Sequence, residues 1–305
     1  MAEDVTERTR SVYDAQHEMV AADEVAFRRL YDMYANASIP IPPEWFKGKT
    51  ALDAGCGNAG PFISWLFDQG IKTVYGVDLG DAWMEKLHAN LERRGIDRSR
   101  LHLKPGNVLE IPHPDESFDF VTINGVLTLM NNLDEVREAF REGVRVLKPG
   151  GYYYTVYGIA GGAFMAAIFP ALQKYYQENA YFKEFIDTIS PEVIHDTIDF
   201  ALNEHRDRTG EAVASEGIKS LFGVEFCVFL QNYIQRPNEL SSQCTPEFVE
   251  SLYEENGFTD VERLNFYVKR TDVRKFSAPL HYNWDHPVSK ALYGQGAVQY
   301  LGVKK

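Results

Sequence analysis

The pattern of hydrophobic and polar positions changes its period near residue 50. Before that point, apolar side chains recur at helical spacing through residues 4–36, and three prolines within residues 38–45 end the pattern. From residue 50 to residue 158, short apolar runs alternate with amphipathic segments of helical period. Such alternation of strand and helix predicts a parallel sheet with helices on both faces.

Five strands are predicted in this alternating part, at residues 50–55, 73–78, 101–107, 118–125 and 152–158. The helices between them are predicted at three places: residues 61–70, a segment capped by Asp81 and ended by Gly95, and the segment from Leu133 to Leu147.

The alternation stops after the fifth strand, because residues 159–243 contain no convincing strand pattern. Ser190 and Pro191 instead begin a clear helix, with serine as the N-cap and proline at the first helical position. The segment is too regular in pattern to be a loop. It is also rich in aromatic side chains, which suggests a lid with an apolar pocket.

Regular structure of mixed type returns near the end of the chain. Thr245 caps a predicted helix that Gly257 ends. A strand is expected next, from the alternation of Leu264, Phe266 and Val268, and the chain closes with a short predicted strand at residues 296–305.

Composition narrows the classes of protein that fit. The chain has 305 residues, 45% of them hydrophobic, and a formal charge of −13. Uniform acidity argues against a surface for nucleic-acid phosphates or anionic lipid. The three cysteines form no disulfide or zinc spacing, and the charged N-terminus lacks the apolar run of a signal peptide. We therefore expect a cytoplasmic protein without nucleic-acid or membrane partners and without a metal.

The stretch LDAGCGNAG, residues 52–60, carries the first chemical signal. Its glycines, Gly55, Gly57 and Gly60, follow a predicted strand and open a predicted helix. Asp78 ends the next strand, 18 residues beyond Gly60, where an acid can bind ribose hydroxyls. Nicotinamide and S-adenosylmethionine (SAM) sites share this arrangement.

Asp53 favours SAM over a dinucleotide. A carboxylate beside the glycines would repel a pyrophosphate, whereas it would attract the ammonium of a methionyl group. Asn107, at the end of the third strand, provides a polar side chain suited to an adenine edge.

Five stretches together resemble the motifs of class I SAM-dependent methyltransferases: LDAGCGNAG, VYGVD, PGNVLEIP, FDFVTINGVL and LKPGG. The resemblance covers roughly residues 50–158 and 245–305. It implies an α/β fold, a three-layer sandwich around a mostly parallel seven-stranded sheet whose last strand is antiparallel. The domains expected are an N-terminal helical cap at 1–48, a SAM-binding core at 49–158 and 244–305, and a helical insertion at 159–243 that forms a lid and acceptor pocket.

The resemblance also implies a set of cofactor-binding residues: Asp53, Gly55, Cys56, Gly57, Gly60, Asp78, Leu79, Asn107, Val108 and Asn124. In this assignment the glycines border the methionyl part, Asp53 lies beneath it, and Asp78 binds the ribose. Asn124 would lie near the sulfonium. The third motif often has Asp where this chain has Asn107, so the adenine contacts there depart from the family pattern.

Methyl transfer needs alignment and water exclusion more than a fixed catalytic motif. Candidate catalytic groups are therefore sought in segments that could close over the sheet edge. They are Tyr13, which shares a helix face with His17, and His281 and His286 in the segment between the last two strands. His195 and Asp199 also share a helix face, but such pairs are common on helices without function.

The expected function is methyl transfer from SAM to a small aromatic or heterocyclic metabolite at oxygen or nitrogen. Three alternatives stay open: a C-methyltransferase acting on a quinone or prenyl chain, an NAD-dependent oxidoreductase, and a regulator of the same fold without turnover. The partner expected is a small-molecule acceptor, and a homodimer is left open.

Overall fold

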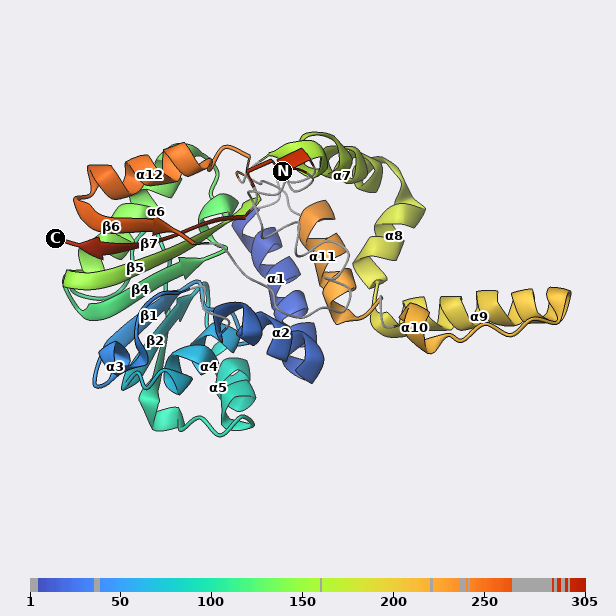
Figure 1. Ribbon diagram of the computed structural model, residues 1–305, viewed down its shortest axis with the longest axis horizontal. Helices are drawn as coiled ribbons and strands as arrows, with labels where there is room; N and C mark the ends of the chain where they lie inside the picture. The colour runs from blue at the N-terminus through green and yellow to red at the C-terminus, as the bar shows by residue number, and fades with distance from the viewer. Residues whose placement is uncertain are drawn as a thin grey trace.

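The computed structural model describes residues 5–35, 39–159, 161–219, 222–235, 240, 242–264, 287, 290, 291, 294, 295 and 297–305. These residues form a seven-stranded sheet with helices on both of its faces, and a group of helices that extends away from one end of the sheet (Figure 1).

The strand order across the sheet is β3-β2-β1-β4-β5-β7-β6. Strand β7 pairs antiparallel with both β5 and β6, whereas the other pairs are parallel. The predicted fold class is therefore confirmed, including the reversed last strand. The strands span Thr50–Ala54 (β1), Thr73–Asp78 (β2), Leu101–Pro105 (β3), Phe118–Asn124 (β4), Leu147–Ile159 (β5), Phe258–Arg263 (β6) and Ala297–Lys304 (β7).

Helices precede, connect and follow these strands, and no helix in the described residues is long and apolar enough to cross a membrane. They span Val5–Ala22 (α1), Glu24–Ala35 (α2), Pro43–Phe46 (α3), Pro61–Asp68 (α4), Met84–Glu92 (α5), Leu133–Val146 (α6), Phe169–Glu178 (α7), Ala180–Thr188 (α8), Pro191–Thr209 (α9), Glu216–Lys219 (α10), Val224–Ile234 (α11) and Pro246–Glu255 (α12).

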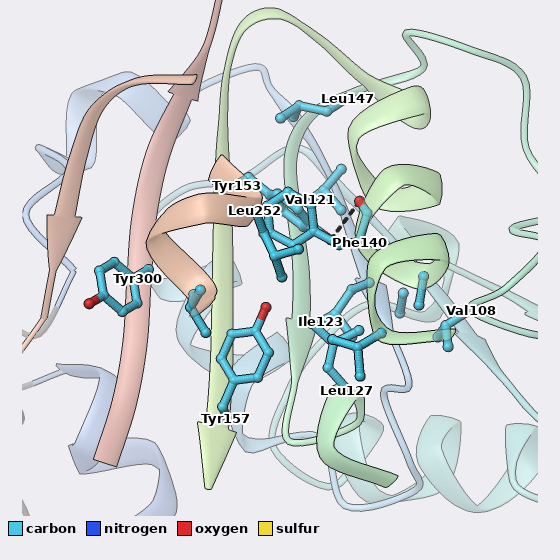
Figure 2. Close-up of a cluster of buried hydrophobic side chains, with 14 of the residues drawn as sticks. Val108, Val121, Ile123, Leu127, Phe140, Leu147, Tyr153, Tyr157, Leu252 and Tyr300 are labelled. Carbon is cyan, nitrogen blue, oxygen red and sulfur yellow. Dashed lines mark hydrogen bonds between the residues drawn. The ribbon is translucent and has the colours of Figure 1, made fainter. Parts of the chain in front are cut away.

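Two apolar layers hold the helices to the sheet. On one face α6 and α12 pack on the central strands, and Phe140, Tyr153 and Leu252 meet there (Figure 2). On the other face Phe62 of α4 packs against Phe120 of β4, and Trp65 of the same helix stacks on Phe62. Burial on both faces explains why the central strands read as nearly continuous apolar runs.

The N-terminal helical segment, expected over residues 4–36, consists of two helices. It breaks at Asp23, whose side chain accepts a hydrogen bond from the N–H of Ala26 at 2.8 Å. Asp23 thus caps a second helix, α2, as short polar side chains do at helix starts. After the break α1 lies beside α11, whereas α2 lies beside α4.

Two further boundaries need comment. Strand β6 spans Phe258–Arg263, directly after the helix-ending Gly257; of the predicted strand positions, Leu264 follows it, and Phe266 and Val268 lie outside the described residues. Its register is broken between Thr259 and Glu262, and this bulge hides the strand's period of two. Helix α5 begins at Met84 without a side-chain cap, so Asp81 does not cap it through its carboxylate.

The inserted helices follow β5. Helix α9 has the predicted N-cap, because Ser190 Oγ accepts the N–H of Val193 at 3.3 Å. None of its 19 residues is buried, and it projects away from the sheet (Figure 1). Helix α11, by contrast, lies beside α1.

Candidate functional site

A cavity of about 340 Å³ opens at the carboxyl ends of β1, β2 and β4. This is the edge at which ligands bind in open parallel sheets. All ten cofactor-binding residues expected from the sequence line this one cavity, as does the expected catalytic residue Tyr13. Residues separated by up to about 110 positions in the chain are thus brought together by the strand order.

Asp78 is fixed at the tip of β2 by two backbone hydrogen bonds. One carboxylate oxygen accepts the N–H of Gly57 at 2.7 Å, and the other accepts the N–H of Leu79 at 2.7 Å. Burial raises the pKa of Asp78, although both N–H groups and nearby His17 oppose that shift. A carboxylate has about four lone-pair positions, so two remain for a ligand's hydroxyl groups.

The glycine loop differs from a simple anion-binding loop. The N–H groups of Gly55 and Cys56 both donate to the carbonyl of Val77, at 2.7 and 3.3 Å, and that of Gly57 is held by Asp78. These three donors are used to attach the loop to β2 and do not point to a phosphate. Burial also raises the pKa of the Cys56 thiol, which keeps it neutral.

Asp53 lies beneath the loop with 5% of its surface exposed. Burial is the main cause that raises its pKa to about 7, and the neighbouring Asp78 carboxylate adds to the shift. A buried carboxylate of this kind is stabilised in its charged form by a positive partner. Among the described cavity-lining residues, none is Lys or Arg.

The lining is therefore strongly acidic. Asp14, Asp53, Asp78 and Glu135 all contribute to it, and among the described lining residues His17 is the one side chain that can become positive. A pyrophosphate dianion would be repelled by this arrangement, whereas a cationic ligand would be attracted.

Helix α1 covers the glycine loop. A Cβ added at Gly57 would overlap the imidazole of His17, so this ring rests directly on the loop. Asn58, which is fully buried, donates from its amide to the backbone carbonyl of Asp14 at 3.5 Å and accepts at its own carbonyl from Asn90 at 2.6 Å. The loop therefore links α1 to α5.

Ion pairs at the outer side of α1 and at the start of α2 agree with this placement. Lys86 of α5 pairs with Glu18 of α1, and Arg94 pairs at 2.9 Å with Glu24, the first residue of α2. Such exposed pairs contribute little stability individually.

Tyr34 of α2 is a site residue that the sequence did not reveal. Its hydroxyl accepts a hydrogen bond from the Asn124 amide at 2.7 Å, and both residues line the cavity. The only sequence signal was its place on an apolar helix face, which equally describes a core tyrosine. Leu129 and Met130 also line the cavity and make part of its wall apolar.

Asn107 uses its side-chain oxygen locally, accepting the N–H of Leu109 at 3.0 Å. Its amide N–H groups are then the atoms that remain for a ligand. Val108 next to it is 7% exposed and supplies an apolar contact in the cavity.

The other candidate groups do not gather at this cavity in the described part of the chain. His281 and His286 lie outside the described residues. His195 and Asp199 each contact Lys219, through its carbonyl at 3.0 Å and its ammonium at 2.6 Å, and so serve to attach α10 to α9. No described residue of 159–243 lines the cavity, so an acceptor pocket formed by the insertion stays a prediction.

Comparison with known proteins agrees with this geometry. Residues 52–155 match the family model of a methyltransferase domain. The demethylmenaquinone methyltransferase of Geobacillus kaustophilus is 36% identical over 106 residues, 34% of this chain and 43% of that protein. An uncharacterized protein of Haemophilus influenzae is 34% identical over 107 residues, 35% of this chain and 41% of that protein. The matched segment thus spans about two fifths of these relatives.

A solved structure extends the likeness in fold to nearly the whole chain. The matched chain belongs to the Haloferax volcanii complex that contains the Trm112 methyltransferase activator. It aligns with 95% of this chain and 96% of its own length, at 14% identity and a TM-score of 0.50. The family match identifies residues 52–155 as a methyltransferase domain, and the seven-stranded sheet has the strand arrangement expected from the resemblance to class I SAM-dependent methyltransferases.

Proposed function

We propose that this protein transfers the methyl group of SAM to a small, partly apolar acceptor at oxygen or nitrogen. The observation that carries the proposal is the pairing of the buried Asp53 carboxylate with the partly buried Asp78 carboxylate in a cavity whose described lining holds no Lys or Arg. A site of this charge suits a nucleoside with positive groups and disfavours a dinucleotide.

The residues present fit SAM. Asp78 keeps lone pairs for ribose hydroxyls, and the position of Asp53 beneath Gly55 and Gly57 suits the ammonium of the amino-acid end. Asn107 and Val108 offer one polar and one apolar contact for an adenine ring. When bound, SAM supplies a methyl group on a positively charged sulfur, which is a good leaving group.

The chain's own contribution is to orient the reactants and exclude water. Helix α1 covers the loop, and Tyr34 holds the Asn124 amide in one orientation at the cavity wall. Fixing two reactants in line accounts for a large part of the barrier reduction in such displacements. The apolar side chains of Leu129 and Met130 suit an acceptor with an apolar portion.

A second acceptor type is favoured by the name of a relative. The Geobacillus kaustophilus protein is a demethylmenaquinone methyltransferase, which supports carbon of a quinone as the alternative acceptor. The identity extends over 106 residues only, so it carries no information about the helices outside the matched segment.

The test is transfer of a labelled methyl group from SAM to three acceptor sets: phenols, heterocyclic amines and reduced quinones. We expect label on oxygen or nitrogen of the first two sets. Label only on quinone carbon would replace the proposal by its alternative. Reduction or oxidation of a nicotinamide cofactor without methyl transfer would contradict both.

A further inference from the structure

His17 stands out among the residues that the proposed function does not use. Its Nδ1 is buried and has no hydrogen-bond partner among the described residues, whereas the residue as a whole is only partly buried and lines the cavity. A buried polar atom without a partner costs about 1–3 kcal/mol. The structure therefore points to a partner that a ligand supplies.

The position of the ring indicates which end of a ligand it meets. The imidazole rests on Gly57, so that any side chain added to this glycine would overlap it. Under the proposed function, Gly57 borders the amino-acid end of SAM, and Asp78 lies on the side of the ribose. The His17 ring is thus closer to the amino acid than to the adenine subsite at Asn107.

The charges in the cavity indicate which group of the amino-acid end His17 contacts. The amino-acid end carries an ammonium and a carboxylate. Asp53 and Asp78 suit the ammonium and repel the carboxylate, and the N–H groups of residues 55–57 are already used within the protein. The carboxylate therefore needs a donor from outside the glycine loop, and helix α1, which covers the loop, supplies the His17 imidazole.

We propose that His17 is a cofactor-binding residue that donates an imidazole N–H to the carboxylate of the amino-acid end of SAM. Helix α1 then forms a wall of the cofactor site and is more than a cover. This inference rests on the proposed function, because it takes SAM as the ligand.

The electrostatic surroundings are consistent with that role. Burial lowers the pKa of His17, and the carboxylates of Asp78 and Asp14 partly oppose the shift. A neutral imidazole still donates one N–H, and hydrogen bonds to a charged acceptor are about twice as strong as neutral ones. Lys86 of α5 approaches α1 but pairs with Glu18.

The test compares two ligands that differ only in the carboxylate: S-adenosylhomocysteine and its decarboxylated form, 5′-(3-aminopropylthio)-5′-deoxyadenosine. Their affinities for the full-length protein are measured by calorimetry for the wild type, His17→Gln and His17→Phe. Both replacements keep a side chain over Gly57. The matched control is His205→Gln on the projecting helix α9, and thermal unfolding verifies that each variant is folded.

His17→Phe should lower the affinity for S-adenosylhomocysteine about tenfold, since a hydrogen bond to a charged group is lost. His17→Gln should lose less, because its amide can donate an N–H in place of the imidazole. The affinity for the decarboxylated ligand should change less than about twofold, which is within ordinary variation between variants. The control should match the wild type with both ligands.

Equal losses with the two ligands, or no loss with either, would overturn the assignment of His17 while leaving SAM binding in place. A wild-type protein that binds neither nucleoside would instead overturn the proposed function, and this inference with it.

Discussion

Helices α6 and α9 have different relations to the rest of the molecule. Helix α6 has 14 residues and buries five of them, including Phe140, against the sheet. Helix α9 is longer, with 19 residues, yet buries none. Both are capped and both read as helices in the sequence, so helix propensity does not distinguish them. The difference shows that burial against the sheet, and not helix propensity, separates a core helix from the projecting helix of the insertion.

The largest expected difference is between substitutions in α6 and in α9, in their effect on the free energy of unfolding. Phe140→Ala should lower the free energy of unfolding by about 3–5 kcal/mol, because it leaves a cavity in a fully buried layer. Phe200→Ala on α9, where the ring is 69% exposed, should change it by less than about 0.5 kcal/mol. Urea unfolding followed by circular dichroism measures both. Comparable losses would show that α9 packs on something in solution.

Substitutions at the cavity and on α9 should also differ in their effect on ligand affinity. Asp78→Asn should weaken S-adenosylhomocysteine binding by about 1–3 kcal/mol, because buried ribose hydroxyls lose a charged acceptor. The matched replacement Asp199→Asn on α9 removes an ion pair with Lys219 and should leave the affinity unchanged. Calorimetry of both variants decides the point. Unchanged affinity in Asp78→Asn would mean that the ribose lies elsewhere.

A smaller effect concerns pH. The pKa of Asp53 is raised to about 7 in the free protein, so below that pH a ligand's ammonium must bind while Asp53 loses a proton. S-Adenosylhomocysteine affinity should therefore fall as pH falls below about 7, by up to about tenfold per unit, and level off above it. The titration is run in His17→Gln, which removes another group that ionises near neutrality. Adding Asp53→Asn should flatten the profile, and an unchanged slope would exclude Asp53 as its source.

The smallest effect compares two tyrosines of α2. Tyr34→Phe removes the hydroxyl that accepts from Asn124 at the cavity, and should weaken S-adenosylhomocysteine binding by about 0.5–1.5 kcal/mol. Tyr31→Phe removes a hydroxyl that donates to Asp68 away from the cavity, and should leave binding unchanged. If the two variants behave alike in calorimetry, the Tyr34–Asn124 bond has no part in ligand binding.

Most of the core was predictable, because its signals are local. Apolar runs separated by glycine, as at residues 50–60, define strand and turn within a few positions. Where the local signal fails, the prediction fails with it. The irregular register in β6 removed the alternation on which strand prediction depends, and the break at Asp23 falls inside an otherwise continuous helical period.

The site was predictable only where a motif joins its residues. Gly57 and Asp78 are 21 positions apart and belong to one strand-helix-strand unit, so their spacing placed both at the same end of the sheet, although their hydrogen bond was not predicted. Tyr34 and Asn124 are 90 positions apart and meet only because α2 packs across the sheet. His17 was seen beside Tyr13 in the sequence, but its contact with Gly57 depends on how α1 lies on the loop.

The central claim is that the acidic edge of the sheet binds a sulfonium nucleoside and not a dinucleotide. It is tested most directly by calorimetric titration of the wild-type protein with S-adenosylhomocysteine and with NAD under the same conditions. We expect saturable binding of S-adenosylhomocysteine, one molecule per chain, and no binding of NAD. Binding of NAD without binding of S-adenosylhomocysteine would contradict it.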